Sequence, residues 1–479
     1  MLLTAACGGW PGGGWPDVGS TGALLGPVWA VAALPEPVAT RRRTATQPPP
    51  NLVLILCDDL GYGDISCYGH STIRTPCLDR LAAEGLRLTD CYAAAPVCSP
   101  ARAGLVTGRA PYRAGIRDWI PPDSAVHLRD DEPSVARLLK SAGYATAHLG
   151  KWHLSGTLDG TQPTPGDHGF DHWFSTQNNA APSHRNPVNF VRNGQPVGPL
   201  EGYSQTLIVD EAIRFLESIG PQPFLLFVWF HAPHEPVAAP EELTSTYDEA
   251  DPTRNVYYGS VTLIDQQVGR LVDYLDETRG RQQTLIFFTS DNGPETHGRY
   301  RGAQHSHGST GGLRGRKLHL HEGGTRVPGI LRWPGQIAAG RTSDEPVSGV
   351  DVLPTFCELA AVPLSRELVL DGTSLVPLLT GQPLDRRQPL YWQYDRALEG
   401  EGPAADGEGA LKFAIRDGPW KLLTDAIHSR YELYHLSVDP QEEHDLAQAM
   451  PERLTHLKAR LRALRAEIDD EQRADFLNP

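Results

Sequence analysis

Three uninterrupted apolar runs, each followed by a polar cluster, constrain the fold of this chain more than any other feature. The runs cover residues 52–56, 224–230 and 285–289 and contain no charged side chain. A strand that is apolar on both sides is typical of a parallel sheet covered by helices on both faces, because neither side meets water. Helices are expected at 75–84, 134–142, 204–216 and 256–275, with a further strand at 145–149. The alternation of strands and helices predicts an α/β fold with a large, mainly parallel sheet flanked by helices.

The last hundred residues follow a different pattern, in which short segments of alternating apolar and polar residues are separated by turns. A basic helix with regularly spaced leucines is expected after them, at 452–468. This pattern predicts a smaller α+β domain with an antiparallel sheet. Its strands are expected at 412–415, 420–423 and 431–434.

We expect three parts along the chain: a leader over residues 1–50, a large domain over 51–375 and a C-terminal domain over 376–479. The leader holds an apolar run at 23–34 with small residues at 30–32, which resembles a signal-peptide core and its cleavage site. Because of this run, export to the periplasm or the exterior is expected. No positive charge precedes the run, as it does in most signal peptides, so a cytoplasmic location is left open. No run of about 20 apolar residues occurs, so no transmembrane helix is expected.

The overall charge of the chain limits its partners. Lys and Arg total 43 against 58 Asp and Glu, a net charge of −15 that argues against general binding of nucleic acid. An anionic substrate therefore needs a local basic cluster. The seven cysteines include no Cys-x-x-Cys pair, which argues against a zinc ribbon or a thioredoxin-like site. Pairing of Cys67 with Cys77, or of Cys77 with Cys91, is left open.

One short segment, Cys-Ser-Pro-Ala-Arg at 98–102, joins a reactive group to a cation. We expect Cys98 at the first turn of a helix, with Ser99 as a cap and Pro100 at the first helical position. Free N–H groups and the helix dipole favour an anion at such a helix start. Arg102 lies four residues on and so shares a face with Cys98. The combination indicates chemistry on an oxyanion ester, and a buried structural cysteine is the alternative.

Acidic and amide side chains follow two of the apolar runs. Asp58 and Asp59 come after the first run, and Asp291 and Asn292 after the third. Because the carboxyl ends of parallel strands share one edge of a sheet, we expect these side chains to converge. Oxygen donors of this kind suit Ca²⁺ or Mg²⁺ better than Zn²⁺. The sequence therefore predicts a site for one divalent cation, with ordinary polar turns as the alternative.

Further candidate residues lie after other strands. Lys151 and His153 are two residues apart, and an extended segment would place both on one side. One supplies a permanent charge and the other an adjustable proton. His148 nearby is interpreted as structural, and His231 and His234 both follow the second apolar run.

The segment 297–326 holds five histidines, five arginines and Lys317. We interpret it as the rim of an anionic pocket, and a solvated basic loop is the alternative.

The Cys-x-Pro-x-Arg segment and the other clusters, in this order, resemble the type I sulfatases of the alkaline-phosphatase-like superfamily. The resemblance covers residue 51 to the C-terminus and implies a large α/β domain with a smaller C-terminal one. It also implies that a formylglycine-generating enzyme oxidises Cys98 to formylglycine, whose hydrate attacks sulfur. The implied metal is calcium, with magnesium possible. One departure is Arg316, which stands where the family usually has a glycine before its lysine.

The resemblance also implies the roles of single residues. Among the two histidines that follow the second run, it favours His234. The implied catalytic set is Cys98, Arg102, Lys151, His153, His234 and Lys317, and the implied metal ligands are Asp58, Asp59, Cys98, Asp291 and Asn292.

The expected substrate is a sulfated carbohydrate cleaved at a chain end. Donors in the segment 297–316, including Arg301 and His305, are expected to contact sugar hydroxyls and further anionic groups, as is the pair His184-Arg185. Two other functions are left open. One is hydrolysis of phosphonate or phosphate esters within the same superfamily, and the other is non-catalytic binding of sulfated glycans.

Overall fold

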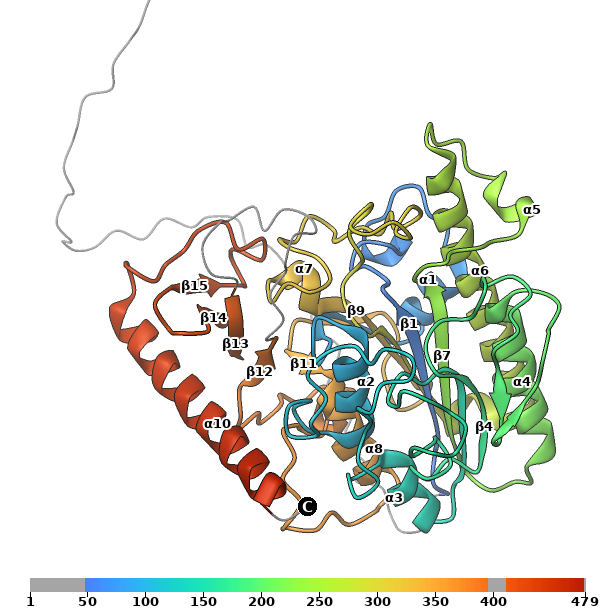
Figure 1. Cartoon of the computed structure of the whole chain (residues 1–479), viewed down its shortest axis with the longest axis horizontal. Coiled ribbons are helices and arrows are strands. Elements are labelled where there is room, and N and C mark those ends of the chain that lie inside the picture. Colours follow the sequence, from blue (N-terminus) through green and yellow to red (C-terminus); the bar gives the residue numbers. More distant parts are fainter. Residues whose placement is uncertain (1–47, 395–410, 478–479) are drawn as a thin grey trace, which may run out of the picture. The chain divides into compact units, whose positions relative to one another are not determined.

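The computed structural model describes residues 48–394 and 411–477, with side chains up to residue 472. The predicted leader run at 23–34 lies outside these residues. The largest element is an eleven-stranded sheet in the order β10-β2-β9-β8-β1-β7-β3-β4-β5-β6, with β11 also paired to β2 (Figure 1). Its strands are β1 Asn51–Asp58, β2 Leu86–Tyr92, β3 Ala145–Lys151, β4 His172–Thr176, β5 Val191–Arg192, β6 Gln195–Pro196, β7 Phe224–Pro233, β8 Thr284–Ser290, β9 Arg326–Arg332, β10 Arg341–Ser343 and β11 Val347–Ser348.

The centre of this sheet is parallel, as the apolar runs predict. β1 lies between β7 and β8, and Leu54 pairs with Phe227 on one side and Phe287 on the other. β3 adds a further parallel strand beside β7. Only β9, β5 and β6 pair antiparallel with their neighbours in the described sheet. The carboxyl ends of β8, β1, β7 and β3 therefore meet at one edge.

Two apolar layers sandwich the sheet. Alternate residues of β1 point to opposite faces, so that Leu54 lies in one buried cluster and Ile55 in the other. Leu105 of α2 packs in the first cluster, and Ile264 of α6 packs in the second. Figure 1 shows α2, α3 and α8 on one side and α4 and α6 on the other. The helices of this part are α1 Pro76–Ala83, α2 Cys98–Thr107, α3 Val135–Ser141, α4 Ser204–Ser218, α5 Glu241–Thr244, α6 Pro252–Leu275, α7 Glu322–Thr325, α8 Val352–Leu359 and α9 Val376–Leu379.

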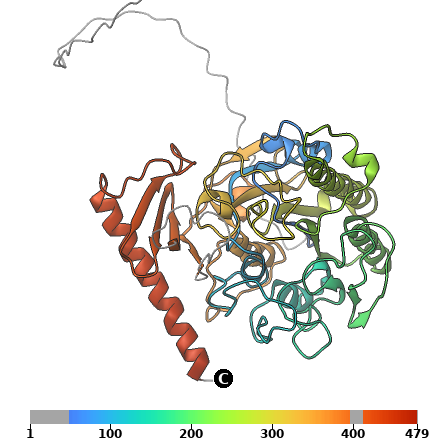
Figure 2. The ribbon, with the colours of Figure 1, turned by 45° about the horizontal axis from the view of Figure 1, so that its top comes forward.

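The C-terminal part forms the predicted antiparallel sheet, with strand order β12-β13-β14-β15. Ile415 and Leu433 of this sheet pack on Leu457 of α10, which lies along it in both Figures 1 and 2. On the other face, Trp392 packs with Val97 and Leu318. The small sheet therefore supports the segments that carry Cys98 and Lys317. Its elements are β12 Leu390–Gln393, β13 Leu411–Asp417, β14 Trp420–Asp425, β15 Tyr431–His435 and α10 Pro451–Leu477. The domain boundary at residue 376 stays a prediction.

Local details correct several expectations. α2 begins at Cys98 itself, with Val97 as N-cap, and Ser99 does not cap it, since Ser99 Oγ accepts a hydrogen bond from the backbone of Ile120. β3 ends at Lys151, and His153 has a left-handed φ of 59°, so the two residues do not continue one extended segment.

Neither of the two cysteine pairings that the sequence left open forms in the structure, where all six cysteines in the described residues are free thiols. Within the same residues, we find no helix with both the length and the apolar character that crossing a bilayer requires.

Candidate active site

The polar clusters predicted after the strands meet at the carboxyl edge of the parallel sheet. The ligand atoms of Asp58, Asp59, Cys98 and His234 all lie within 4.8 Å of one another. Cys98 Sγ is 3.4 Å from Asp58 Oδ1. Asp58 ends β1, and Asp59 follows with a left-handed φ of 62°. Such backbone strain at a non-glycine residue is typical of functional sites.

Two buried lysines neutralise these two carboxylates. Lys317 Nζ donates to both oxygens of Asp59, at 2.6 and 2.7 Å. Lys151 Nζ donates to Asp58 Oδ2 at 2.5 Å and to Asn179 Oδ1 at 3.2 Å. Burial by itself raises the pKa of Asp58, but Lys151 and the other nearby cations bring it well below its ordinary value. The edge therefore holds fixed positive groups despite the acidic composition of the chain.

Arg102 holds the third carboxylate of the cluster. Its Nε and Nη2 donate to Asp291 Oδ2 at 3.0 and 2.6 Å, and its Nη1 donates to the carbonyl oxygen of Lys151 at 2.7 Å. The other oxygen of Asp291 accepts the N–H of Asp59 at 3.1 Å. The guanidinium is fully buried and lies over the ring of Trp229. Arg102 thus fixes the ends of β8 and β3 relative to each other.

In each of the two histidines of the site, one ring nitrogen donates to a backbone carbonyl oxygen and the other is available as an acceptor. His153 Nε2 lies 3.1 Å from the carbonyl oxygen of Ile120, which can only accept, so Nε2 carries the proton and Nδ1 is the free acceptor. Burial lowers the pKa of His153 well below its ordinary value. His234 Nδ1 donates to the carbonyl oxygen of Glu235 at 2.6 Å, which leaves Nε2 toward Asp59 at 3.5 Å. Burial also lowers the pKa of His234, to about 4.

The donor set fits a hard divalent cation. Asn292 donates its amide to Asp59 Oδ1 at 2.6 Å, while its own Oδ1 is buried with no donor. A buried oxygen without a partner is costly, and coordination to a cation would satisfy it. Together with the carboxylates of Asp58, Asp59 and Asp291, it offers the all-oxygen environment that Ca²⁺ and Mg²⁺ prefer.

A pocket of about 340 Å³ leads from the surface to Cys98. Its inner end carries Cys98, His153, His234 and Lys317. Trp119, Asn178, Glu295 and Tyr300 were not expected from the sequence. For Glu295, one feature of the sequence could have indicated a place in the site, because it lies three residues after the predicted metal ligand Asn292. The remaining lining residues are Val97, Asn179, Arg299 and Leu318.

Much of the expected basic rim does not reach this pocket. Of the five arginines in segment 297–326, only Arg299 lines it, and none of the five histidines of that fully described segment does. The backbone N–H of His305 donates to Glu235 Oε1, and Arg301 is exposed. His184 is fully buried beside His231. Arg301, His305 and the pair His184-Arg185 therefore do not line this pocket, and their contact with a sugar stays a prediction.

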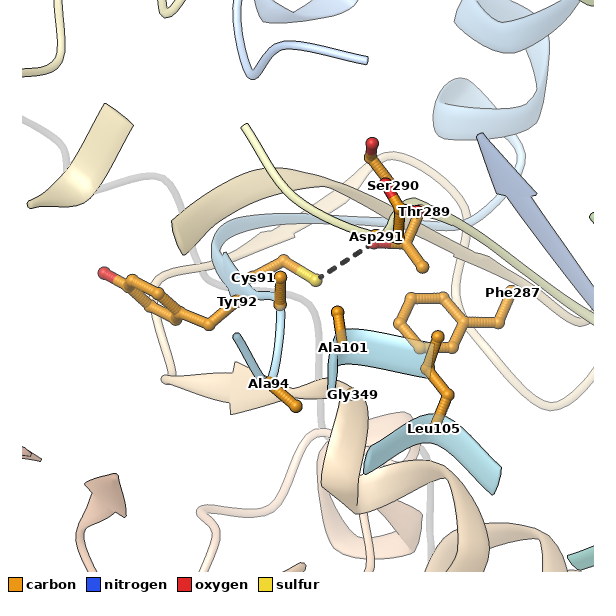
Figure 3. A pocket seen from close by; sticks show the side chains of 11 residues that line it. Cys91, Tyr92, Ala94, Ala101, Leu105, Phe287, Thr289, Ser290, Asp291 and Gly349 are labelled. Atoms are coloured by element: carbon orange, nitrogen blue, oxygen red, sulfur yellow. Dashed lines mark hydrogen bonds between the residues drawn. The ribbon is translucent and has the colours of Figure 1, made fainter. Parts of the chain in front are cut away.

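A second, much smaller cavity lies behind Asp291 (Figure 3). Its volume of about 10 Å³ is at the lower limit for one water molecule. Figure 3 shows Ala101 and Leu105 of α2 facing Phe287 of β8 across it, with Cys91 Sγ 3.7 Å from Thr289 Oγ1. It is a packing gap between a helix and the sheet, too small for a substrate.

The ten residues of the implied catalytic and metal-binding sets thus lie together in one site. Nine form a continuous network of contacts and His153 lines the same pocket; the nine are Asp58, Asp59, Cys98, Arg102, Lys151, His234, Asp291, Asn292 and Lys317.

Comparison with known proteins agrees with this geometry. The profile of the family described as Sulfatase matches residues 50–362. The chain belongs to the sulfatase family. A second profile, N-sulphoglucosamine sulphohydrolase, C-terminal, matches residues 315–467. The chain is accordingly a sulfuric ester hydrolase with an alkaline-phosphatase-like fold.

Similar proteins span most of this sulfatase. Arylsulfatase A of Homo sapiens is 34% identical over 475 residues, covering 88% of each chain. N-acetylgalactosamine-6-sulfatase of Canis lupus familiaris is 32% identical over 460 residues, covering 86% of this chain and 84% of that protein. The crystal structure of Ps i-CgsB in complex with k-i-k-neocarrahexaose has a TM-score of 0.77 at 29% identity, covering 88% of this chain and 93% of that one.

Proposed function

We propose that this sulfatase works through a formylglycine made from Cys98. The observation that carries the proposal is the position of Cys98, at the first turn of α2 and at the inner end of the pocket, 3.4 Å from Asp58. The unmodified thiol is poorly suited to attack, because burial and the nearby carboxylates raise its pKa well above the ordinary value. The hydrated aldehyde would supply one oxygen for attack on sulfur and a second hydroxyl for the release of sulfate.

We propose that Asp58, Asp59, Asp291 and Asn292, with the group at position 98, hold one divalent cation. Calcium is the proposed ion and magnesium the alternative, since every donor is an oxygen. A bound cation would polarise a sulfate oxygen and favour ionisation of the attacking hydroxyl.

The remaining residues would bind the sulfate and move protons. Lys151 and Lys317 point their ammonium groups at this cluster and would neutralise sulfate oxygens, with His234 contributing through Nε2. His234 would also protonate the leaving alcohol. His153 offers its unprotonated Nδ1 to take a proton from the second hydroxyl. Arg102 would keep Asp291 in place.

The proposed substrate is a sulfated carbohydrate cleaved at a chain end. The pocket has room for a small sugar unit, with the aromatic rings of Trp119 and Tyr300 and the amide of Asn178 in its wall. The name N-acetylgalactosamine-6-sulfatase of a relative at 32% identity also supports a sugar ester. The complete set of site residues supports catalysis over mere glycan binding.

Maturation and location complete the proposal. We propose a formylglycine-generating enzyme as a transient partner, because Cys98 keeps its Cys-x-Pro-x-Arg context. Export is proposed from the apolar run at 23–34 alone.

The test is mass spectrometry of the peptide that contains Cys98, together with sulfate release by the same preparation. We expect an aldehyde at position 98, and we expect Cys98→Ala to abolish sulfate release while the protein stays folded. Cys77→Ala is the matched control, because Cys77 is a free thiol away from the pocket. A fully active preparation that carries only an unmodified thiol at position 98 would refute the proposal.

A further inference from the structure

A second group of metal-ligand side chains lies where the segment after β8 meets the start of α6. We call it the outer cluster and define it by Asp251, His297 and His307. One ligand atom of each residue lies within 4.8 Å of the ligand atoms of the other two. The described residues that line the active-site pocket include none of the three. The chemistry proposed for the pocket therefore makes no use of this cluster.

His307 lies at the centre of the outer cluster. Its side chain is 7% exposed, and its Nε2 lies 3.5 Å from Asp251 Oδ2. Its ring stacks on that of His297, with the ring centroids 4.5 Å apart. Burial and the neighbouring His297 lower the pKa of His307 to about 4. The ring is therefore neutral at pH 7, which is the form of histidine that binds a metal.

The spacing of these atoms suits a small tetrahedral ion. Bonds of 2.0–2.1 Å in a tetrahedron place neighbouring ligand atoms about 3.3 Å apart, close to the 3.5 Å between His307 Nε2 and Asp251 Oδ2. His297 is exposed, and its Nε2 donates to the carbonyl oxygen of Gln304 at 3.2 Å, which leaves Nδ1 as its lone-pair nitrogen. Two imidazoles and a carboxylate favour Zn²⁺ over Ca²⁺, because Ca²⁺ takes oxygen ligands.

Asp251 supplies the negative charge of the outer cluster. Its Oδ1 caps α6 by accepting the backbone N–H of Thr253 at 3.0 Å, so that Oδ2 is the oxygen toward His307. The side chain is 46% exposed, which gives an ion access from solvent. Thr253 also bridges the two residues, with Oγ1 2.6 Å from Asp251 Oδ1 and 2.7 Å from His307 Nε2. A purely hydrogen-bonded cluster is therefore the alternative to a metal site.

Two further basic groups act on His307, and each lies beside a carboxylate. Arg254 Nη1 is 3.8 Å from Glu249 Oε2, and His305 Nδ1 is 3.5 Å from Glu235 Oε2. These carboxylates offset part of the repulsion that a divalent ion would meet at the outer cluster.

The position of the outer cluster gives a bound ion a structural role. His297 and His307 flank residues 298–306, which include Arg299 and Tyr300 of the pocket wall. Within this loop, the backbone N–H of Gly298 donates to the carbonyl oxygen of Ala303 at 2.7 Å. An ion bound to both histidines and to the cap of α6 would tie both ends of the loop to that helix.

We propose that Asp251, His297 and His307 bind one Zn²⁺ ion, and that this ion clamps the loop 298–306 against the start of α6. Water would complete the tetrahedron. The site goes beyond the proposed function, which uses none of these three residues.

The experiment uses Co²⁺ as a probe, because tetrahedral Co²⁺ with nitrogen ligands absorbs visible light far more strongly than Co²⁺ surrounded by oxygen. The full chain, without a histidine tag, is titrated in excess Ca²⁺, which occupies the all-oxygen site. We expect an absorption band that saturates at about one Co²⁺ per chain and disappears when Zn²⁺ is added.

Two variants remove ligands at little cost to the fold. His297→Ala changes an exposed side chain, and Asp251→Asn keeps a residue that caps a helix well. Each should weaken Co²⁺ binding about tenfold or more. His444→Ala is the matched control, because it removes a histidine that is 78% exposed and lies 3.8 Å from Asp439, outside the cluster. That control should leave binding unchanged.

The clamp is tested by hydrogen exchange of the peptide that contains residues 298–306. With Zn²⁺ at about ten times its dissociation constant, exchange should slow about tenfold, because the loop opens only when the ion leaves. The same Zn²⁺ concentration should have no such effect on His297→Ala.

Two results would overturn the inference. A visible band that is absent, or equally strong in both ligand variants, shows that the outer cluster is only hydrogen-bonded. Exchange that Zn²⁺ does not slow in the unchanged protein removes the clamp. Sulfate release by the same preparations, measured in Ca²⁺ alone, tests the proposed function separately.

Discussion

Replacing Lys421 with methionine tests how the C-terminal sheet is joined to the segment that carries Lys317. Lys421 lies in β14 and is fully buried between two carboxylates. Its Nζ is 2.8 Å from Glu322 Oε1 and 3.1 Å from Glu442 Oε1. Glu322 begins α7, five residues after Lys317. The substitution keeps an unbranched side chain of similar size and removes the ammonium group, with its charge and its hydrogen bond to Glu322.

The expected cost follows from what the two carboxylates retain. Removing one partner from a buried ion pair costs about 3–5 kcal/mol, because it leaves an uncompensated charge out of water. Glu322 keeps the hydroxyl of Tyr92 at 2.6 Å and a longer contact to Arg326 at 3.4 Å. We therefore expect the lower end, about 3 kcal/mol, or about a hundredfold change in the unfolding equilibrium.

The assay is urea unfolding followed by tryptophan fluorescence, with midpoint and slope compared between variants. Lys140→Met is the matched control, because Lys140 forms a 2.7 Å ion pair with Asp171 but its side chain is 48% exposed. That control should lose at most about 1 kcal/mol. If Lys421→Met unfolds at the same urea concentration as Lys140→Met, the buried carboxylates do not depend on this lysine and the reasoning fails.

Two further predictions address the metal site and acid stability. Asp291→Ala should lower both the content of divalent metal and the activity, because it removes a proposed ligand and leaves Arg102 without its carboxylate. The metal content is measured by elemental analysis, and an unchanged content would contradict the assignment. Burial raises the pKa of Glu211, but His172, Arg192 and Arg214 hold it at about 2, below an unfolded value of about 4.3. The stability that the Glu211 ion pairs contribute is therefore present above about pH 4.3 and is lost as the pH falls from there toward 2. Glu211→Gln should flatten the pH dependence of the unfolding free energy in that range. An unchanged slope would contradict this prediction.

The parallel centre of the sheet could be predicted from the sequence, because a strand buried on both sides must be apolar at every position. That condition gave β1, β7 and β8 directly. β2 and β9 were missed, since their charged residues and Pro328 break the apolar pattern. These strands are fixed by pairing with each other over a long separation in the chain.

For the site as well, some features could be predicted from the sequence and others depend on the tertiary structure. Sequence by itself placed the candidate metal ligands, because Asp58, Asp59, Asp291 and Asn292 follow the ends of strands that local burial sets. Only the tertiary structure decided what each charge faces. Arg299 lines the pocket but is neutralised by Glu295, whereas Arg301, two residues away, lies outside it. A charge acts through its surroundings in space, and packing brings together side chains such as Lys317 and Asp59 that the sequence separates by more than half the chain.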